Sequence, residues 1–191
     1  IDTDNKILLG AKDGTTSLNC GVGLDLSTDS YVYSNSSIQD STWVTVTAVY
    51  LGSEARFYID GNLDAIVATN NFDPYTPINP HLIGIEPGYT HIFRGWLDNV
   101  QIWNTALTQS EIQNYMSCPP TGNESGLVGY WNFEEGSGSS AVLDQTSNGN
   151  DGTINGATYN TNVPSQSCNL TNANGCDSTA VLNLTINNCS V

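Results

Sequence analysis

Polar and apolar residues alternate over short stretches of this chain, and turn-forming residues separate the stretches. The alternation in Thr42–Leu51 predicts a β-strand with one buried and one solvent-facing side. Ala55–Ile59 is expected to run back beside it, and Asp60-Gly61, a dipeptide typical of tight hairpins, leads into Leu63–Ala68. These segments together predict an antiparallel sheet.

Comparable apolar runs recur elsewhere, bounded mostly by Gly, Asn, Asp or Ser. Further strands are expected at Lys6–Gly10, Gly21–Leu26, Ser30–Tyr33, Phe93–Trp103, Leu127–Phe133, Gly152–Tyr159 and Ser178–Asn188. One helix interrupts the series, because Thr108 and Glu111 form the sequence signature of a capping box, and it is expected to end near Met116. The fold class predicted from these patterns is all-β with one short helix.

Changes in composition divide the chain into four parts. Residues 1–117 are expected to form the main part of a β-sandwich, and residues 118–126, which begin with Cys-Pro-Pro, a linker. Residues 127–168 supply further sandwich strands. Residues 169–191 form a C-terminal extension strand that either folds back onto its own domain or is donated to a neighbouring molecule.

The charge balance excludes several kinds of partner. Four basic residues face 19 acidic ones, and a net charge of −15 repels nucleic acid and anionic membrane surfaces while favouring cations such as calcium. No apolar stretch is long enough to cross a bilayer, so no membrane insertion is expected. Because the chain begins at Ile1 without a methionine, we expect a mature or trimmed product.

Cysteines and glycosylation motifs point to an oxidising, extracellular or cell-surface setting. Five sequons are candidate N-glycosylation sites, at Asn35, Asn123, Asn169, Asn183 and Asn188, and Ser41 and Ser178 are candidate O-glycosylation sites. In a chain this rich in Asn, Ser and Thr, the alternative is that these motifs arise by chance.

The five cysteines cannot all pair with one another inside one chain. Cys176 and Cys189 would lie about 40 Å apart on one extended strand at about 3.3 Å per residue, too far for a disulfide. Cys118 and Cys168 bracket the segment at 126–160 and are the expected internal pair. Cys20 is left with the two tail cysteines, and at least one of the three stays free or bonds outside the chain, unless the sequence is a piece of a longer protein.

Three passages identify a family resemblance. They are WVTVTAVY…ARFYIDGNLDA at 43–65, FRGWLDNVQIWNTALTQSEIQNY at 93–115 and GLVGYWNFEEGSGSSAVLDQTSNGNDGTINGATY at 126–159. They resemble the laminin-G-like, concanavalin-A-like jelly rolls of surface proteins from Bacteroidetes-type bacteria, and the tail resembles linking repeats of such proteins. The resemblance implies an antiparallel β-sandwich of jelly-roll type, with a C-terminal extension strand.

The order of these passages differs from the family pattern. In the family, a passage like 126–159 begins the domain and one like 93–115 ends it, so this chain resembles a rearranged domain that lacks one or two strands. Unpaired backbone groups at such a gap cost about 1–3 kcal/mol each when kept dry. The tail strand is the candidate to fill the gap, within the chain or in a neighbouring copy, through Ser178, Ala180, Leu182, Leu184 and Ile186. Repeated insertion into neighbours would give a filament of identical chains.

Catalytic signatures are absent from the sequence, and the chain is predicted not to be an enzyme. His81 and His91 have no metal-type spacing, and no nucleophile motif is present. Glu134 and Glu135 are adjacent, so on a strand they point to opposite faces and cannot flank one glycosidic bond.

Calcium is the metal that fits the acidic loop at 144–151. Its oxygen-bearing side chains, with Asp98 at a position that the resemblance associates with structural calcium, give the candidate ligands Asp98, Asp144, Asn148, Asn150 and Asp151. The alternative is a turn stabilised by its own Asx side chains.

Sugar binding is the common role that the resemblance implies. Tyr75 and Tyr89 in Pro- and Gly-containing loops are the expected surface aromatics, whereas Trp96, Trp103 and Trp131 are expected in the core. The leading hypothesis is a structural or adhesive surface protein that assembles head to tail with copies of itself. The alternatives are a calcium-dependent carbohydrate-binding module of a larger adhesin or secreted enzyme, and a spacer domain of a giant adhesin.

Overall fold

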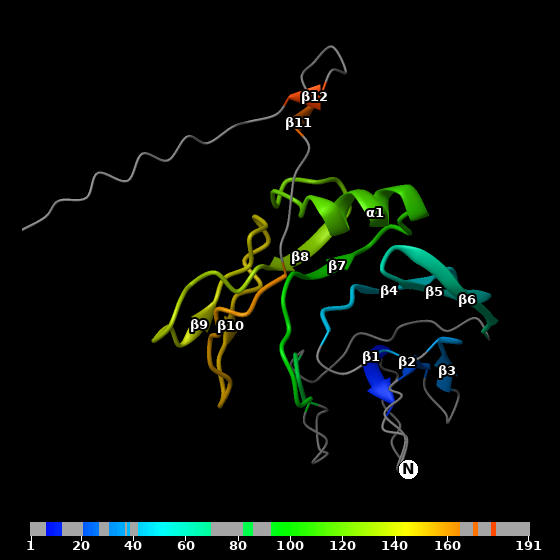
Figure 1. Ribbon diagram of the computed structural model, residues 1–191, viewed down its shortest axis with the longest axis horizontal. Helices are drawn as coiled ribbons and strands as arrows, with labels where there is room; N and C mark the ends of the chain where they lie inside the picture. The colour runs from blue at the N-terminus through cyan, green and yellow to red at the C-terminus, as the bar shows by residue number, and fades with distance from the viewer. Residues whose placement is uncertain are drawn as a thin grey trace, which may run out of the picture.

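The computed structural model describes residues 7–12, 21–26, 31–36, 38, 42–69, 82–85, 93–164, 170–171 and 177–178. Over these residues the fold is an antiparallel β-sandwich with one helix, as the family resemblance implies, and its strands and helix agree with the all-β class that the alternation of polar and apolar residues predicts (Figure 1). The predicted fold class is therefore confirmed.

The best-packed part of the fold is the meander of β4 (Val46–Tyr50), β5 (Glu54–Ile59) and β6 (Asn62–Ala68). Its register places Ala48 and Ala65 on either side of Phe57, which is fully buried. Because alternate residues share a face, the same side of the sheet carries the largest apolar cluster of the described residues, formed by Ala55, Phe57 and Ala65 with Ile38, Val46, Ala48, Tyr50, Ile59 and Val67 around them.

The opposite face of this sheet packs against α1 (Gln109–Ser117). Ile112 of the helix is buried with Val49 and Tyr58. The predicted capping box is present: the Thr108 side chain accepts from the Glu111 N–H, and the Glu111 carboxylate accepts from the Thr108 N–H. The helix therefore begins where the sequence predicts, and it ends one residue beyond Met116.

A second sheet is formed by β1 (Ile7–Lys12), β2 (Gly21–Leu26) and β3 (Tyr31–Tyr33), and Figure 1 shows it below β4–β6. The residues that follow β3 are fixed to the meander by Asp64 of β6. Its carboxylate accepts from the backbone N–H groups of Asn35 and Ser36 at 2.5–3.1 Å. One side chain therefore joins the two sheets.

A two-stranded ladder lies below α1, formed by β7 (Val100–Trp103) and β8 (Leu127–Trp131) (Figure 1). The prediction of one continuous strand over Phe93–Trp103 is wrong, because the described strand begins only at Val100. Asn99 has a φ of 52°, a left-handed conformation that breaks an extended chain, and its N–H bonds to the Asp98 carboxylate at 2.9 Å. The short pair β9 (Ala141–Val142) and β10 (Gly152–Thr153) follows.

The last described elements are β11 (Leu170–Thr171) and β12 (Asp177–Ser178), which pair with each other. Ser178 is opposite Leu170 of its own chain, so the first residue of the predicted assembly strand has a ladder partner within the chain. The other predicted assembly residues, Ala180, Leu182, Leu184 and Ile186, lie outside the described residues. In the described part of the chain, no helix is long and apolar enough to span a membrane.

Candidate functional site

The loop at 144–151 is organised around the carboxylate of Asp144, which is 9% exposed. It accepts five hydrogen bonds, from the backbone N–H groups of Tyr130, Thr146 and Asn150, from the Thr146 hydroxyl and from the Asn150 amide. Burial by itself would raise the pKa of Asp144, but these hydrogen bonds outweigh it and lower the pKa to about 2. Asp144 therefore stays ionised and holds the loop against β8.

The other predicted calcium ligands of this loop are also held in contacts within the protein. The side-chain amides of Asn148 and Asn150 donate to the Val128 carbonyl at 2.9 and 3.0 Å, and Asp151 accepts from the Asp144 N–H at 2.9 Å. A calcium ion needs several oxygens with free lone pairs. The Asp144 carboxylate does not fit that role in this geometry, because both its oxygens face N–H and O–H donors.

Asp98, the fifth predicted ligand, belongs to a different cluster. It bonds to the Asn99 N–H, and Asn99 accepts from the Tyr130 hydroxyl at 2.7 Å. Burial, together with the nearby charge of Glu134, raises the pKa of Asp98. Among the described residues no group of three or more His, Cys, Asp or Glu side chains is arranged to hold a metal. Calcium binding stays a prediction.

Glu134 and Glu135 have different neighbours, although β8 ends at Trp131, so the strand on which their opposite orientation was predicted does not reach them. Glu134 is exposed and interacts electrostatically with Asp98. Glu135 accepts from the Leu143 N–H at 2.8 Å and from the Tyr159 hydroxyl at 2.6 Å. The two carboxylates therefore do not converge on one point as a glycosidase pair would.

The tryptophans differ sharply in burial. Trp131 is buried and donates its Nε1–H to the Asn150 carbonyl at 2.9 Å, as a core residue should. Trp103 is half-buried against Tyr115. Trp96, also expected in the core, is instead 53% exposed, because the chain before Val100 does not continue the strand that would have carried the ring inward. That prediction is wrong.

Trp96 is part of an exposed apolar region. Its ring centroid lies 6.3 Å from that of Trp43, and the planes are tilted by 30°. The Trp43 Nε1–H is buried and has no acceptor among the described residues. The Phe93 N–H bonds to the Gly84 carbonyl at 2.8 Å, which brings a second segment alongside. We use the name Trp96 surface for these two segments, 82–85 and 93–97, whose large exposed apolar side chains are Leu82, Ile83, Ile85, Phe93, Trp96 and Leu97.

One signal in the sequence marks this surface. Gly95 lies within the predicted strand, near its start, where glycine commonly marks an irregularity or a close approach. A Cβ at Gly95 would lie 2.9 Å from the Phe93 ring, so glycine allows that ring to fold over the backbone. The predicted sugar-binding residues Tyr75 and Tyr89 lie outside the described residues.

Only some of the predicted glycosylation sites lie among the described residues. Asn35 and Asn123 are exposed, and the Asn35 amide donates to the Asp64 carbonyl at 2.8 Å. Ser178 lies in β12, and the other candidates, Asn169, Asn183, Asn188 and Ser41, lie outside the described residues. Cys118 is disulfide-bonded, and its predicted partner Cys168 also lies outside them. That pairing stays a prediction.

Comparison with known families and structures gives one family match. Residues 1–113 match the model described as the concanavalin A-like lectin/glucanases superfamily, of laminin-G type. The match includes the meander and the first half of α1, but not the passage at 126–159. In the structure that passage is nevertheless part of the sandwich, because its strand β8 pairs with β7. Among curated proteins, no sequence is significantly similar to this chain.

Two solved structures are similar. A candidate carbohydrate-binding protein from Bacteroides ovatus is 18% identical, with a TM-score of 0.57 over 80% of this chain and 50% of the other. This chain therefore spans half the length of that protein, and the likeness shows the fold alone. An S-layer domain-containing protein from Clostridium thermocellum is also 18% identical, over 61% of this chain and 64% of the other, with a TM-score of 0.38.

Proposed function

Because the chain belongs to the concanavalin A-like lectin/glucanase superfamily, we propose that it is a non-catalytic, lectin-like module that binds carbohydrate. The carbohydrate binding ascribed to the Bacteroides protein of similar fold supports this reading. Folds of this kind host many functions, so the proposal depends on the site rather than on the fold.

The observation that carries the proposal is the exposure of Trp96. An indole that is 53% exposed presents a flat apolar face, onto which the C–H groups of a pyranose ring can pack. Trp43 supports the ring from one side and Phe93 lies three residues before Trp96 in the sequence. A rigid aromatic platform of this kind loses little conformational freedom on binding.

Titration calorimetry with soluble oligosaccharides, after a glycan array has identified a ligand, tests the proposal. Trp96→Ala should weaken binding about tenfold or more, and Trp96→Tyr should retain much of it, because the stacking face is kept. Ile66→Ala, which removes another exposed apolar side chain from β6, is the matched control. An array without bound glycans, or a Trp96→Ala protein that binds like the parent, would exclude the proposal.

The non-catalytic part of the proposal has its own support. Glu135 is bonded to Leu143 and Tyr159, and Glu134 points elsewhere, so this pair cannot supply an acid and a base to one bond. Incubation with the array ligands should release no reducing sugar.

The proposed location is extracellular, at the cell surface. The disulfide at Cys118 and the sequons at exposed Asn35 and Asn123 support a compartment outside the reducing cytosol. Intact-mass measurement of protein from its native source would show whether the sequons carry glycans.

Calcium dependence is a separate proposal, and the geometry of Asp144 counts against it. Since this carboxylate is already satisfied by five donors, carbohydrate binding should survive treatment with a chelator. If the chelator abolishes binding, a bound cation takes part in carbohydrate binding and the calcium proposal holds.

Self-assembly is the second candidate function, and the apolar character of the Trp96 surface favours it. Aliphatic side chains such as Ile83 and Leu97 are 47% and 41% exposed, and exposed apolar residues that gather together are typical of protein–protein interaction sites. Among the described strands, β4 and β7 are two of the several that have a single ladder partner, and a strand of this kind can pair with an added strand. We propose the tail at 178–188 of a neighbouring copy as that strand, which requires Ser178 to leave its pairing with Leu170.

Deletion of residues 177–191 tests self-assembly. The full chain should form oligomers or fibres that light scattering and electron microscopy detect, and the deletion variant should be monomeric. A monomeric full chain, or unchanged polymers after the deletion, would exclude strand donation while leaving the carbohydrate proposal intact.

A further inference from the structure

Asparagine followed by glycine is a chemically reactive pair, and the described part of the chain contains two such pairs, Asn148-Gly149 and Asn155-Gly156. The glycine nitrogen can attack the side-chain amide carbon of the asparagine and close a succinimide ring, while the amide nitrogen leaves as ammonia with the proton of the glycine N–H. Water then opens the ring to aspartate or isoaspartate. Glycine favours the attack because it has no Cβ to hinder it.

The two pairs are closely matched in exposure and in the conformation of the glycine. Both asparagines are exposed. Gly149 and Gly156 have φ values of 71° and 82°, and neither has an atom within 4 Å of an added Cβ. Neither glycine N–H donates a hydrogen bond to any residue that the structure describes. Exposure and backbone conformation therefore do not distinguish the two sites.

The side-chain contacts do distinguish them. The Asn148 amide donates to the Val128 carbonyl of β8 at 2.9 Å, and the Asn148 N–H donates to the Thr146 hydroxyl at 3.2 Å. Within the described ranges, no group forms a hydrogen bond with the side chain of Asn155. Because the amide must turn towards the glycine nitrogen to react, Asn148 must first leave Val128. Asn155 needs no such opening step.

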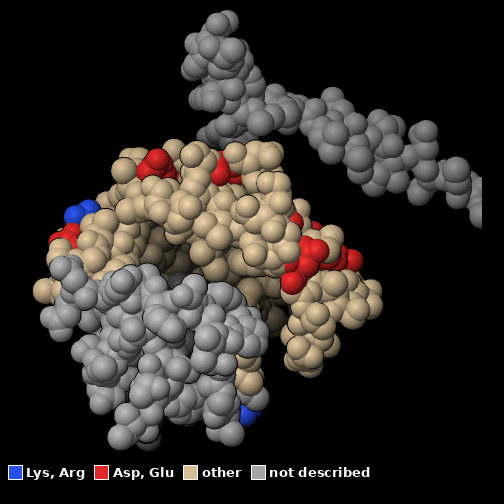
Figure 2. Space-filling view, turned by 180° about the vertical axis from the view of Figure 1, so that it is seen from behind, with Lys and Arg blue, Asp and Glu red and all other residues tan. Residues whose placement is uncertain are grey.

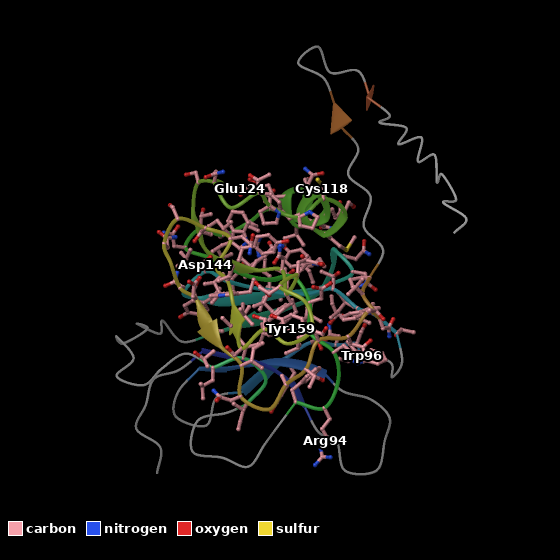
Figure 3. The ribbon with its side chains drawn as sticks, turned by 90° about the vertical axis from the view of Figure 1, so that its left-hand side faces the viewer. Arg94, Trp96, Cys118, Glu124, Asp144 and Tyr159 are labelled. Carbon is pink, nitrogen blue, oxygen red and sulfur yellow. The ribbon has the colours of Figure 1, made fainter. Side chains whose placement is uncertain are left out.

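The two sites also lie at opposite ends of the β9–β10 pair. Since these strands are antiparallel, the loop at 144–151 joins them at one end, and the residues after β10 leave at the other end (Figure 1). Figure 3 shows Asp144 of the loop and Tyr159, which follows Asn155 in the sequence, at separate places on this segment. Asn155 is therefore outside the loop that Asp144 organises.

We propose that Asn155 is a site of spontaneous deamidation, and that the contact with β8 protects Asn148 from the same reaction. Conversion of Asn155 adds one negative charge to a chain of net charge −15, whose described acidic side chains gather at the upper rim and along one side in Figure 2. At Asn148 the product would place a carboxylate against the Val128 carbonyl. Two acceptors would then face each other without a proton, and the loop would lose this contact with β8.

Peptide mapping by mass spectrometry, during incubation in mildly alkaline buffer, measures both rates in one sample. In the folded protein Asn155 should convert at least about fivefold faster than Asn148, since one ordinary hydrogen bond opposes opening by about that factor. In urea-unfolded protein the two rates should be similar, because both asparagines precede glycine. Asn155→Gln should remove the acidic species that carries the Asn155 product. Asn174-Gly175 lies outside the described residues, and its peptide is measured separately.

Asp144→Ala connects the protection to the loop. This variant removes the acceptor of five hydrogen bonds, so Asn148 should convert faster while Asn155 keeps the parental rate. A folded Asp144→Ala protein with an unchanged Asn148 rate would overturn the part assigned to the loop. If the variant does not fold, the comparison of folded and unfolded parent protein decides.

That comparison has definite unfavourable outcomes. Equal rates at the two sites in the folded parent, or an intact Asn155 under conditions in which the unfolded chain converts, would overturn the proposal. A difference that persists in urea would belong to the neighbouring residues in the sequence, and the protective role of β8 would be wrong. Each of these results leaves the proposed carbohydrate binding untouched.

Discussion

Asp144 shows how one buried charge can organise a loop that has little secondary structure. Its hydrogen bonds join β8, through Tyr130, to Thr146 and Asn150 in the loop. The sequence places carboxylates and amides together at 144–151, but it does not reveal which way they face. The Tyr130 donor comes from a strand fourteen residues away. Whether the Asp144 carboxylate binds a cation or accepts hydrogen bonds from the protein therefore depends on a contact between distant parts of the sequence.

Asp144→Ala should therefore be one of the most destabilising polar substitutions in the described part of the chain. It leaves five donors without their acceptor, and we expect a loss of about 3 kcal/mol in the free energy of unfolding, measured with urea. Asp151→Ala removes one hydrogen bond from the same loop and should cost about 1 kcal/mol. Equal losses in the two variants would show that Asp144 does not organise the loop.

The same carboxylate makes the stability depend on pH in a defined range. Its pKa is about 2 in the folded protein and 3.8 in the unfolded chain, so the ionised form favours folding. This contribution is fully present above about pH 4 and is lost as the pH falls towards 2. Urea unfolding of the parent protein and of Asp144→Asn between pH 2 and 5 measures it. The variant should have a flatter profile, and parallel profiles would contradict the assignment.

At the scale of elements, the hairpin between β5 and β6 follows directly from its turn residues. Asp60 and Gly61 both have positive φ, 48° and 70°, as the Asp-Gly dipeptide predicts for a two-residue turn that matches the twist of the strands. Gly61 has a second role that the sequence does not reveal. Its carbonyl accepts from Gln113 of α1 at 3.0 Å, and a Cβ there would lie 2.7 Å from the Gln113 Cγ.

Gly61→Ala should therefore lower the free energy of unfolding by more than the strain of a positive φ alone would. The left-handed conformation costs a non-glycine residue about 1 kcal/mol, and crowding against α1 should add about 1 kcal/mol more. Gly149→Ala is the matched control, because Gly149 has nearly the same φ, 71°, and no atom within 4 Å of an added Cβ. Denaturant unfolding of both variants separates the two costs, and equal losses would mean that the turn does not press on the helix.

The contrast between this hairpin and the approach to β7 shows what local patterns can predict. Turns and caps depend on neighbouring residues, so Asp60-Gly61 and the Thr108 capping box are found where the sequence predicts them. The alternation in Phe93–Trp103 looks equally regular, yet Asn99 breaks it, because the Asp98 carboxylate and the Tyr130 hydroxyl bond to Asn99. As a result Trp96 lies on the surface, and the periodicity of the sequence does not predict that it belongs to the candidate site.

At the scale of the whole molecule, described contacts attach the segment outside the family match to the rest of the sandwich. This segment joins the sandwich through β7 and β8, and it follows α1 through the turn at 121–124. Within this turn Gly122 has a φ of 98°, and a Cβ there would lie 2.1 Å from the Gln145 carbonyl. The residues expected to form a linker are therefore packed tightly against the segment that they introduce.

The disulfide of Cys118 should provide the covalent part of this attachment. If Cys168 is its partner, the bond closes a loop of about fifty residues that contains β8, β9 and β10, and ties that loop to the end of α1. Closing a loop of this length restricts the unfolded chain and is worth about 4 kcal/mol, so reduction should lower the free energy of unfolding by that amount. Peptide mapping without reductant should recover Cys118 linked to Cys168. Linkage to Cys20, Cys176 or Cys189 would instead place the attachment elsewhere in the chain.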